Sequence, residues 1–257
     1  MNSFRQENNH EVEKSSTRSK AISPKGNILN LVLLDIDGTL TQSYEYDREI
    51  FGIAIAEVLG VPPIDADLNG YTDKTSLGVT MEAIHRLSGR SSEQSEIEQV
   101  KLNVLRRLND MYRESPRVFS EVPGASLFLE RLRKFNEGRI AIATGCWLRE
   151  ALFKLQASGL NVDGIPMATS DDSKNRLKIM EIAVGMAGNY YGCSSFDRVV
   201  YVGDGPWDLQ TSRSLGYKFV GIGPRVETLK DLESFPWHQD FLDTEAVLAS
   251  LTSELRL

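Results

Sequence analysis

The sequence predicts an α/β protein in which a Rossmann-like parallel sheet core carries an inserted all-helical cap domain. Short apolar runs alternate with helix-spaced segments over the second half of the chain. This is the pattern of strands joined by right-handed helical crossovers in a parallel sheet. Residues 44–117 break the pattern, because they contain three segments with helical spacing and no run typical of a strand. A chain of 257 residues is long enough for a core domain and a smaller companion.

The elements of the core follow in order along the chain. The first strand is predicted at 28–34, an apolar run typical of a strand covered on both faces. Further strands are expected at 139–143, near Ile165, at 198–202 and at 218–222. Helices are expected at 125–135, 148–158, 175–187 and 207–215. Gly159 and Gly216 are suited to end two of these helices.

The domain boundaries follow from these elements. Residues 1–27 are rich in polar residues and poor in apolar ones, so we expect a flexible tail or, alternatively, a partner-docking arm. The core domain is assigned to 28–43 and 118–257, and the helical cap to 44–117. Cap helices are predicted at 47–59, 75–87 and 92–111, with turn-forming glycine and proline residues around them.

Composition narrows the classes of partner. The formal net charge is −7 and no basic stripe stands out, so nucleic acid is not expected as a partner. The two cysteines form no disulfide framework and fit a reducing, cytoplasmic location. No apolar run approaches the roughly 18 residues of a membrane span. We expect a monomer or a weak homodimer.

An apolar strand leads directly into two carboxylates in the stretch LVLLDIDGTLT. Asp35 and Asp37 follow this strand one residue apart, and open α/β sheets bind ligands at the carboxyl ends of their strands. Two acids there repel each other unless a cation or a shared proton offsets their charge, and Mg²⁺ is a natural cation for carboxylates and phosphate. The alternative is an ordinary strand-ending turn, which Gly38 permits.

A second strand ends in the same way. In VVYVGDGPWDL the apolar run leads into Asp204, and Asp208 follows four residues later, early in the next helix. These acids can supply the remaining ligands of a metal ion. Taken alone, Asp208 fits equally well as a first-turn acid that the helix dipole favours. Two strands of one sheet that both end in acid–glycine pairs favour the metal site.

Two further segments offer groups for an anion. The strand IAIATG ends in Thr144 and Gly145, where the hydroxyl and the following backbone N–H groups can point at a phosphate or only cap the strand end. The loop SDDSKNR contains Lys174 and Arg176. Either of these can supply the cation that balances the aspartates and an anionic ligand.

In order and strand context, these four segments resemble the motifs of the haloacid dehalogenase-like superfamily of phosphatases. The matching residues are DIDGT at 35–39, IAIAT at 140–144, Lys174, and GDGPWD at 203–208. The resemblance extends over about residues 30–222. The helical segment after the first motif is similar to the cap of phosphoglycolate phosphatase-like members. SKNRLKIM departs from the proline-containing run that follows the third motif in those members, so Arg176 stays an alternative to Lys174.

The resemblance implies a role for each motif residue. It implies that Asp35 attacks phosphorus and forms an aspartyl-phosphate, while Asp37 protonates the leaving alcohol and then accepts a proton from water. Thr144 and Lys174 would hold the phosphoryl oxygens. The implied Mg²⁺ ligands are Asp35, the backbone carbonyl of Asp37, Asp204 and, directly or through water, Asp208. Because a halide leaves without a proton, the second aspartate favours phosphate esters over carbon–halogen substrates.

The stretch LNGYTDKTSL, residues 68–77, matches the loop that closes over the substrate in helical-cap members. Gly70 would permit the turn, and Tyr71, Thr72, Asp73 and Lys74 could face the site. The candidate substrate contacts are Gly70, Tyr71, Asp73, Gly145 and Arg176. The alternative for the stretch is a plain helix start, capped by Thr72 or Asp73.

The resulting prediction is a magnesium-dependent phosphatase that hydrolyses a small phosphorylated metabolite. A phosphomutase of the β-phosphoglucomutase kind shares the chemistry but returns the phosphoryl group to a sugar. A catalytically silent binding module would keep only the fold. No histidine partners Cys146 in the sequence, so Cys146 is expected to be a packing residue, and Trp207 is expected to pack beneath the loop of the fourth motif.

Overall fold

The apolar runs of the sequence form one parallel sheet. The computed structural model of the protein describes residues 30–135, 139–229 and 232–252, and within them six strands pair in the order β3-β2-β1-β4-β5-β6, all parallel. The strands are β1 (Asn30–Leu34), β2 (Ile140–Ala143), β3 (Met167–Ala168), β4 (Arg198–Gly203), β5 (Lys218–Ile222) and β6 (Trp237–His238). The predicted α/β class is therefore confirmed.

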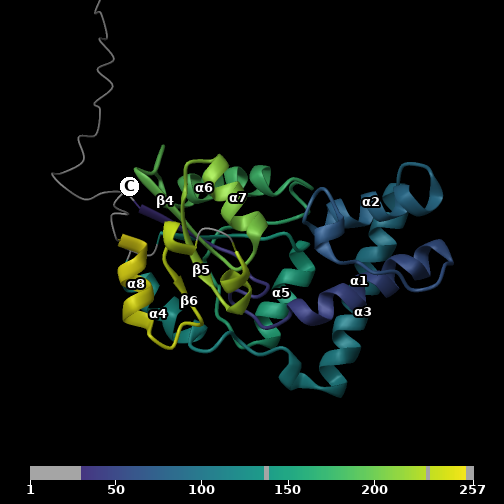
Figure 1. Ribbon diagram of the computed structural model, residues 1–257, viewed down its shortest axis with the longest axis horizontal. Coiled ribbons are helices and arrows are strands. Elements are labelled where there is room, and N and C mark those ends of the chain that lie inside the picture. Colours follow the sequence, from purple (N-terminus) through teal and green to yellow (C-terminus); the bar gives the residue numbers. More distant parts are fainter. Residues whose placement is uncertain (1–29, 136–138, 230–231, 253–257) are drawn as a thin grey trace, which may run out of the picture.

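Helices cover both faces of the sheet (Figure 1). These helices are α4 (Ala125–Phe135), α5 (Leu148–Ala157), α6 (Arg176–Tyr191), α7 (Pro206–Ser214) and α8 (Thr244–Thr252). Leu31 and Leu33 of β1 belong to the hydrophobic cluster with α6 and α7, while Val32 and Leu34 belong to the cluster with α4, α5 and α8. The central strand is thus buried on both faces, as its unbroken apolar run requires.

Three of the helices between β1 and β2 form a separate layer at the right of Figure 1. They are α1 (Tyr44–Leu59), α2 (Ser76–Ser88) and α3 (Gln94–Glu114), with short 3-10 turns at Leu68–Gly70 and Pro116–Val118. Their buried side chains form a hydrophobic cluster that also includes Trp147, which immediately precedes α5. The Trp147 ring stacks on Phe51 of α1 with ring centroids 5.5 Å apart. An aromatic contact therefore joins this helical layer to the core.

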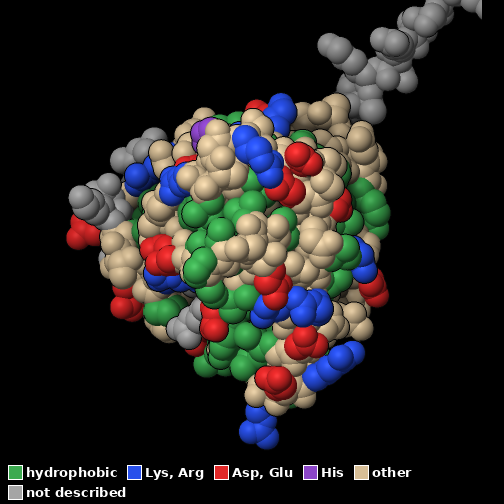
Figure 2. Space-filling model, turned by 90° about the vertical axis from the view of Figure 1, so that its right-hand side faces the viewer, with side chains coloured by type: hydrophobic (Ala, Val, Ile, Leu, Met, Phe, Trp, Pro, Cys, Tyr) green, Lys and Arg blue, Asp and Glu red, His purple; other side chains and the backbone are tan. Residues whose placement is uncertain are grey.

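The outer surface of this helical layer carries charges of both signs side by side (Figure 2). Arg90 pairs with Glu96 at 2.6 Å, and Arg106 pairs with Glu57 at 2.9 Å. Pairs exposed in this way contribute little to stability. Among the helices that the structure describes, none combines the length and apolar character needed to cross a membrane.

The structure differs from the sequence prediction at the later strands. The strand expected near Ile165 begins at Met167, because Pro166 has no N–H group to donate to a neighbouring strand. Ile165 itself packs in the core. The edge strand β6 and helix α8 were not predicted. Residues 1–27, predicted as the tail, lie outside the described residues, and the proposed domain boundaries stay a prediction.

Candidate active site

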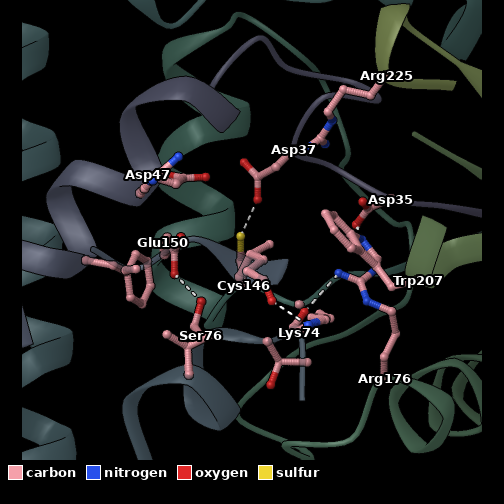
Figure 3. Close-up of a pocket in the computed structure, with 17 residues that line it drawn as sticks. Asp35, Asp37, Asp47, Lys74, Ser76, Cys146, Glu150, Arg176, Trp207 and Arg225 are labelled. Atoms are coloured by element: carbon pink, nitrogen blue, oxygen red, sulfur yellow. Dashed lines mark hydrogen bonds and ion pairs between the residues drawn. The ribbon is translucent and has the colours of Figure 1, made fainter. Parts of the chain in front are cut away.

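A cavity lies at the carboxyl end of the sheet, between the core and the helical layer (Figure 3). Its lining comes from the loops after β1, β2 and β5, from the first turns of α5, α6 and α7, and from α1, α2 and the segment that joins them. Asp35 and Asp37 lie on its core side, and Asp47 and Ser76 lie on the opposite side. The sequence motifs therefore meet at one cavity.

Three buried carboxylates gather beside this cavity. Asp35, Asp204 and Asp208 each offer an oxygen within 4.8 Å of the others. The parallel pairing of Leu34 with Val202 brings the ends of β1 and β4 to one level, which places Asp35 near Asp204. The Oδ1 atoms of Asp35 and Asp204 are buried and accept no hydrogen bond. Buried carboxylate oxygens without a donor fit a site built for a cation.

The surroundings shift the acidities of these carboxyls. Burial, together with the neighbouring Asp208 charge, raises the pKa of Asp35 well above its ordinary value. Burial also raises the pKa of Asp204 to about 7, although the Arg225 guanidinium opposes the shift. A bound cation would favour the ionised form of both groups.

The donor set fits a divalent cation with a preference for oxygen ligands. Asp208 already accepts two hydrogen bonds, from Arg176 Nη1 at 2.7 Å and from the Gly205 backbone N–H at 3.0 Å. Asp35 and Asp204 are therefore the side chains that keep an oxygen open for direct contact, while Asp208 is suited to contact through water.

Arg176 lies beside the acids in the position expected for Lys174. Arg176 Nη1 is 3.7 Å from Asp35 Oδ1, and its side chain lines the cavity. Lys174 is 54% exposed, and its Nζ lies 3.5 Å from Asp73 Oδ2, away from the acids. Helix α6 begins at Arg176, after the N-cap residue Asn175. Arg176, the first residue of α6, is therefore the side-chain cation that lies beside the acids. The structure corrects the expectation for Lys174 and favours the alternative, Arg176.

Thr144 and Gly145 lie where the second motif predicts. Thr144 is buried, and its Oγ1 accepts a hydrogen bond from the Cys146 N–H at 3.3 Å. Gly145 lines the cavity, and a β-carbon there would come within 2.7 Å of Arg176 Nη2 and 3.0 Å of the Lys74 carbonyl. The glycine therefore permits the close approach of both Arg176 and the cap.

The predicted cap loop reaches the cavity through Lys74, as expected, but not through the other residues expected to face it. Lys74, Thr75 and Ser76 belong to the lining, whereas Gly70, Tyr71 and Asp73 do not. The Tyr71 ring lies under the Arg86 guanidinium at 4.7 Å. Asp73 instead faces Lys174, and the Gly70 carbonyl accepts from Arg86 at 2.6 Å. Their contacts with Arg86 and Lys174 hold these three residues outside the lining, so the expected substrate contacts move to residues 74–76.

The sequence itself matches no family model and no curated protein. Solved structures are similar in fold. CbbY from Rhodobacter sphaeroides in complex with phosphate is 18% identical, with a TM-score of 0.61 over 84% of this chain and 95% of that chain. A putative β-phosphoglucomutase from Bacteroides vulgatus is 20% identical, with a TM-score of 0.60 over 88% and 91%. A HAD hydrolase of family IA, variant 3, from Entamoeba histolytica is 16% identical, with a TM-score of 0.59 over 87% and 100%.

The chain has the haloacid dehalogenase-like fold. The structures that share it include a HAD hydrolase whose whole chain is covered. At these sequence identities, the structural similarity establishes the fold only.

A fully buried lysine lies on the other side of the cavity in this haloacid dehalogenase-like fold. Lys154 Nζ is 3.0 Å from Asp37 Oδ1, 2.7 Å from Asp47 Oδ1 and 2.7 Å from Glu150 Oε1. The ammonium group donates hydrogen bonds to Asp47, Glu150 and Cys146 Sγ, and the Asp37 carboxylate completes its surroundings as an ion-pair partner. Asp47 belongs to α1, so Lys154 links the helical layer to the core.

Sequence reasoning missed this lysine, although a signal was present. Ala151 and Leu155 of α5 are buried, and helical spacing puts Lys154 on the same face. A lysine within an apolar stripe needs buried acidic partners. Glu150, four residues earlier, is the partner that the sequence itself offers.

Lys154 favours the ionised form of Asp37. Burial alone would raise the pKa of Asp37, but the Lys154 ammonium and hydrogen bonds from Cys146 and Ser43 outweigh it and hold the pKa below its ordinary value. Cys146 packs in the core as expected and also donates its thiol to Asp37 Oδ2. Burial raises the pKa of the Cys146 thiol, which keeps it protonated as a donor.

Trp207 and Arg225 line the remaining side of the cavity. Trp207 packs against Gly205 in the loop of the fourth motif and also lines the cavity. The Arg225 guanidinium lies over its ring at 5.4 Å. Arg225 also binds Asp204. It comes from the loop after β5, beyond the last matched motif, so no sequence signal marked it.

Replacing Lys154 with Met should strongly destabilise the fold, because the buried Glu150 and the half-buried Asp37 and Asp47 lose their shared cation. We expect the free energy of unfolding to fall by about 3–5 kcal/mol in chemical denaturation. Lys134→Met is the matched control. Lys134 makes the same (i,i+4) contact, to Glu130 at 2.8 Å, but on an exposed surface. It should unfold like the wild type, and equal stability of both variants would contradict the role of Lys154.

Divalent-cation affinity should depend on pH through Asp204. The pKa of Asp204 is raised to about 7, so protons compete with the cation below that pH. We expect the affinity for Mn²⁺ to rise from about pH 5 to pH 7, by up to about tenfold per unit for each proton released, and the raised pKa of Asp35 adds to this rise. Titration calorimetry at several pH values measures this, and a flat profile would contradict the assignment.

Proposed function

We propose that this protein is a Mg²⁺-dependent, haloacid dehalogenase-like phosphatase that hydrolyses a small phosphorylated metabolite through an aspartyl-phosphate on Asp35. One observation carries the proposal. Asp35 and Asp204 each keep one buried oxygen without a donor at the carboxyl end of the sheet, beside the Arg176 cation. The structures that share the fold support it, since one of them is in complex with phosphate.

The metal requirement follows from charge. Mg²⁺, held by Asp35, Asp204, the backbone carbonyl of Asp37 and, through water, Asp208, would offset the negative charge that builds up when a phosphate ester meets these acids. Mg²⁺ suits this small set of carboxylates because it keeps several waters and binds phosphate oxygens.

In the first step, an Asp35 carboxylate oxygen forms a bond to phosphorus while the ester P–O bond breaks. Arg176 stabilises the charge on the phosphoryl oxygens, with Thr144 and the backbone N–H groups after it as further donors. The proton that the leaving alkoxide needs comes from Asp37. The arriving phosphoryl dianion raises the pKa of Asp37 by like-charge repulsion and so favours its protonation before transfer.

In the second step, water attacks phosphorus and the bond to Asp35 breaks, which restores the carboxylate. Asp37, now ionised, accepts the proton of the attacking water. Lys154 favours this ionised state. Helix α1 and residues 74–76 of the cap would cover the phosphoryl group and exclude bulk water during both steps.

A phosphomutase remains the second candidate, because a putative β-phosphoglucomutase shares the fold. The same Asp35 and Asp37 would then transfer the phosphoryl group to a sugar hydroxyl. The product separates the two functions: a phosphatase releases inorganic phosphate, and a mutase releases an isomeric sugar phosphate.

Asp35→Asn should abolish turnover, because an amide cannot attack phosphorus. With a panel of phosphorylated metabolites and Mg²⁺, we expect phosphate release to fall by at least about 1,000-fold in this variant and to stop in EDTA. Asp110→Asn, at an exposed acid on α3, is the matched control and should keep wild-type turnover. Release by Asp35→Asn at the wild-type rate would contradict the mechanism.

Arg176→Met and Lys174→Met should differ sharply in activity. Arg176 lines the cavity, so its loss should lower kcat/KM by about 100-fold or more, the effect of removing one transition-state donor. Lys174 is half exposed and faces Asp73, so Lys174→Met should stay close to wild type. The reverse order of the two variants would restore Lys174 as the phosphate-binding cation.

A further inference from the structure

Arg225 binds one oxygen of Asp204 and leaves the other open. Its Nε lies 2.9 Å from Asp204 Oδ2, and its Nη2 donates to the same atom. Asp204 Oδ1 is buried and accepts no hydrogen bond. An arginine that faces a carboxylate freely tends to use both oxygens. The one-sided contact therefore fixes the carboxylate while one oxygen stays available.

Neighbouring residues build this contact. The Arg225 guanidinium lies over the Trp207 ring at 5.4 Å, a stacking that the flat guanidinium group favours. The Trp207 ring in turn lies so close to Gly205 that a β-carbon there would come within 2.3 Å of it. Arg225 is thus held by an aromatic face from the first turn of α7 as well as by Asp204.

Gly38 provides the space for the pair. A β-carbon at this position would come within 1.7 Å of Asp204 Oδ2 and 2.8 Å of Arg225 Nη2. Its φ of +79° also lies in the left-handed region that favours glycine. The glycine of the DIDGT motif is therefore required both by the turn and by the Arg225–Asp204 contact.

We propose that Arg225 is a positioning residue for the metal, which holds Asp204 by Oδ2 so that Oδ1 is presented to the ion, with Trp207 as its support. The inference rests on the proposed function, since it takes Asp204 as a metal ligand. Hydrogen-bonded partners of metal-binding carboxylates orient them in this way. A competing role, in which Arg225 takes the metal's place on Asp204, predicts the opposite effect on affinity.

Metal affinity measured without substrate separates these roles. The full chain is stripped with EDTA and titrated with Mn²⁺, and the signal of the free ion in electron paramagnetic resonance gives the dissociation constant. We expect Arg225→Met to bind Mn²⁺ about 10–100-fold more weakly than the wild type. Equal or tighter binding by Arg225→Met would overturn the proposal, and tighter binding would identify Arg225 as a competitor.

Two controls make the result specific. Arg86 also stacks on an aromatic ring, Tyr71, and pairs with an acid, Glu82, but on the cap. Arg86→Met should leave the Mn²⁺ affinity unchanged, and a similar loss in this variant would overturn the proposal. Asp204→Asn should lose most of the binding. Wild-type affinity in Asp204→Asn, or no binding by the wild type, would instead overturn the metal site of the proposed function.

A second pair of variants keeps the test valid if Arg225→Met does not fold, as judged by circular dichroism. Trp207→Leu removes the stacking face and keeps the arginine, so it should weaken Mn²⁺ binding by a smaller factor. Arg225→Lys keeps the charge without the planar guanidinium, and its affinity should lie between those of the wild type and Asp204→Asn. Wild-type affinity in both variants would overturn the proposal.

Discussion

Buried negative charge is the constraint on which the rest of this site depends. Parallel strands end at one level, so the acids that follow β1 and β4 are forced together away from water. Their charge is offset by cations from other parts of the chain. Arg176 from α6 contacts Asp35 and Asp208, and Arg225 from the loop after β5 contacts Asp204. The Oδ1 atoms of Asp35 and Asp204 accept no hydrogen bond. A metal ion bound to them would offset the remaining negative charge.

Negative charge also gathers on the other side of the cavity, where a lysine side chain offsets it. Asp37, Asp47 and Glu150 share the fully buried ammonium of Lys154. One carboxylate in this group is the proposed acid and base, and another comes from cap helix α1. A buried ion pair with good geometry is costly to break and contributes orientation more than net stability. In the proposed mechanism, metal chemistry therefore takes place on the Asp35 side of the cavity and proton transfer on the Lys154 side.

The motifs that end strands could be predicted from the sequence, because an apolar run that stops at an acid marks both a strand and its ligand-binding end. Such runs mark the strands of the sheet, and they place Asp35, Asp37, Thr144, Asp204 and Asp208 at one end of it. Lys154 and Arg225 could not be placed in the same way, since their roles depend on tertiary contacts with residues far along the chain. The sequence could not decide between Lys174 and Arg176, because the position at which α6 begins determines which side chain turns toward the acids. The two-residue strand β6 is too short to give a periodic signal.

The central claim is that Asp35 carries the phosphoryl group. The most direct measurement is to mix the enzyme with a turned-over phosphate ester and Mg²⁺, quench in acid within the first turnover, digest, and find the modified peptide by mass spectrometry. The account predicts one added phosphoryl group on the peptide that contains Asp35, lost in alkali and absent from Asp35→Asn. Turnover with no phosphoryl group on Asp35 at any quench time, or the group on another residue, would contradict it.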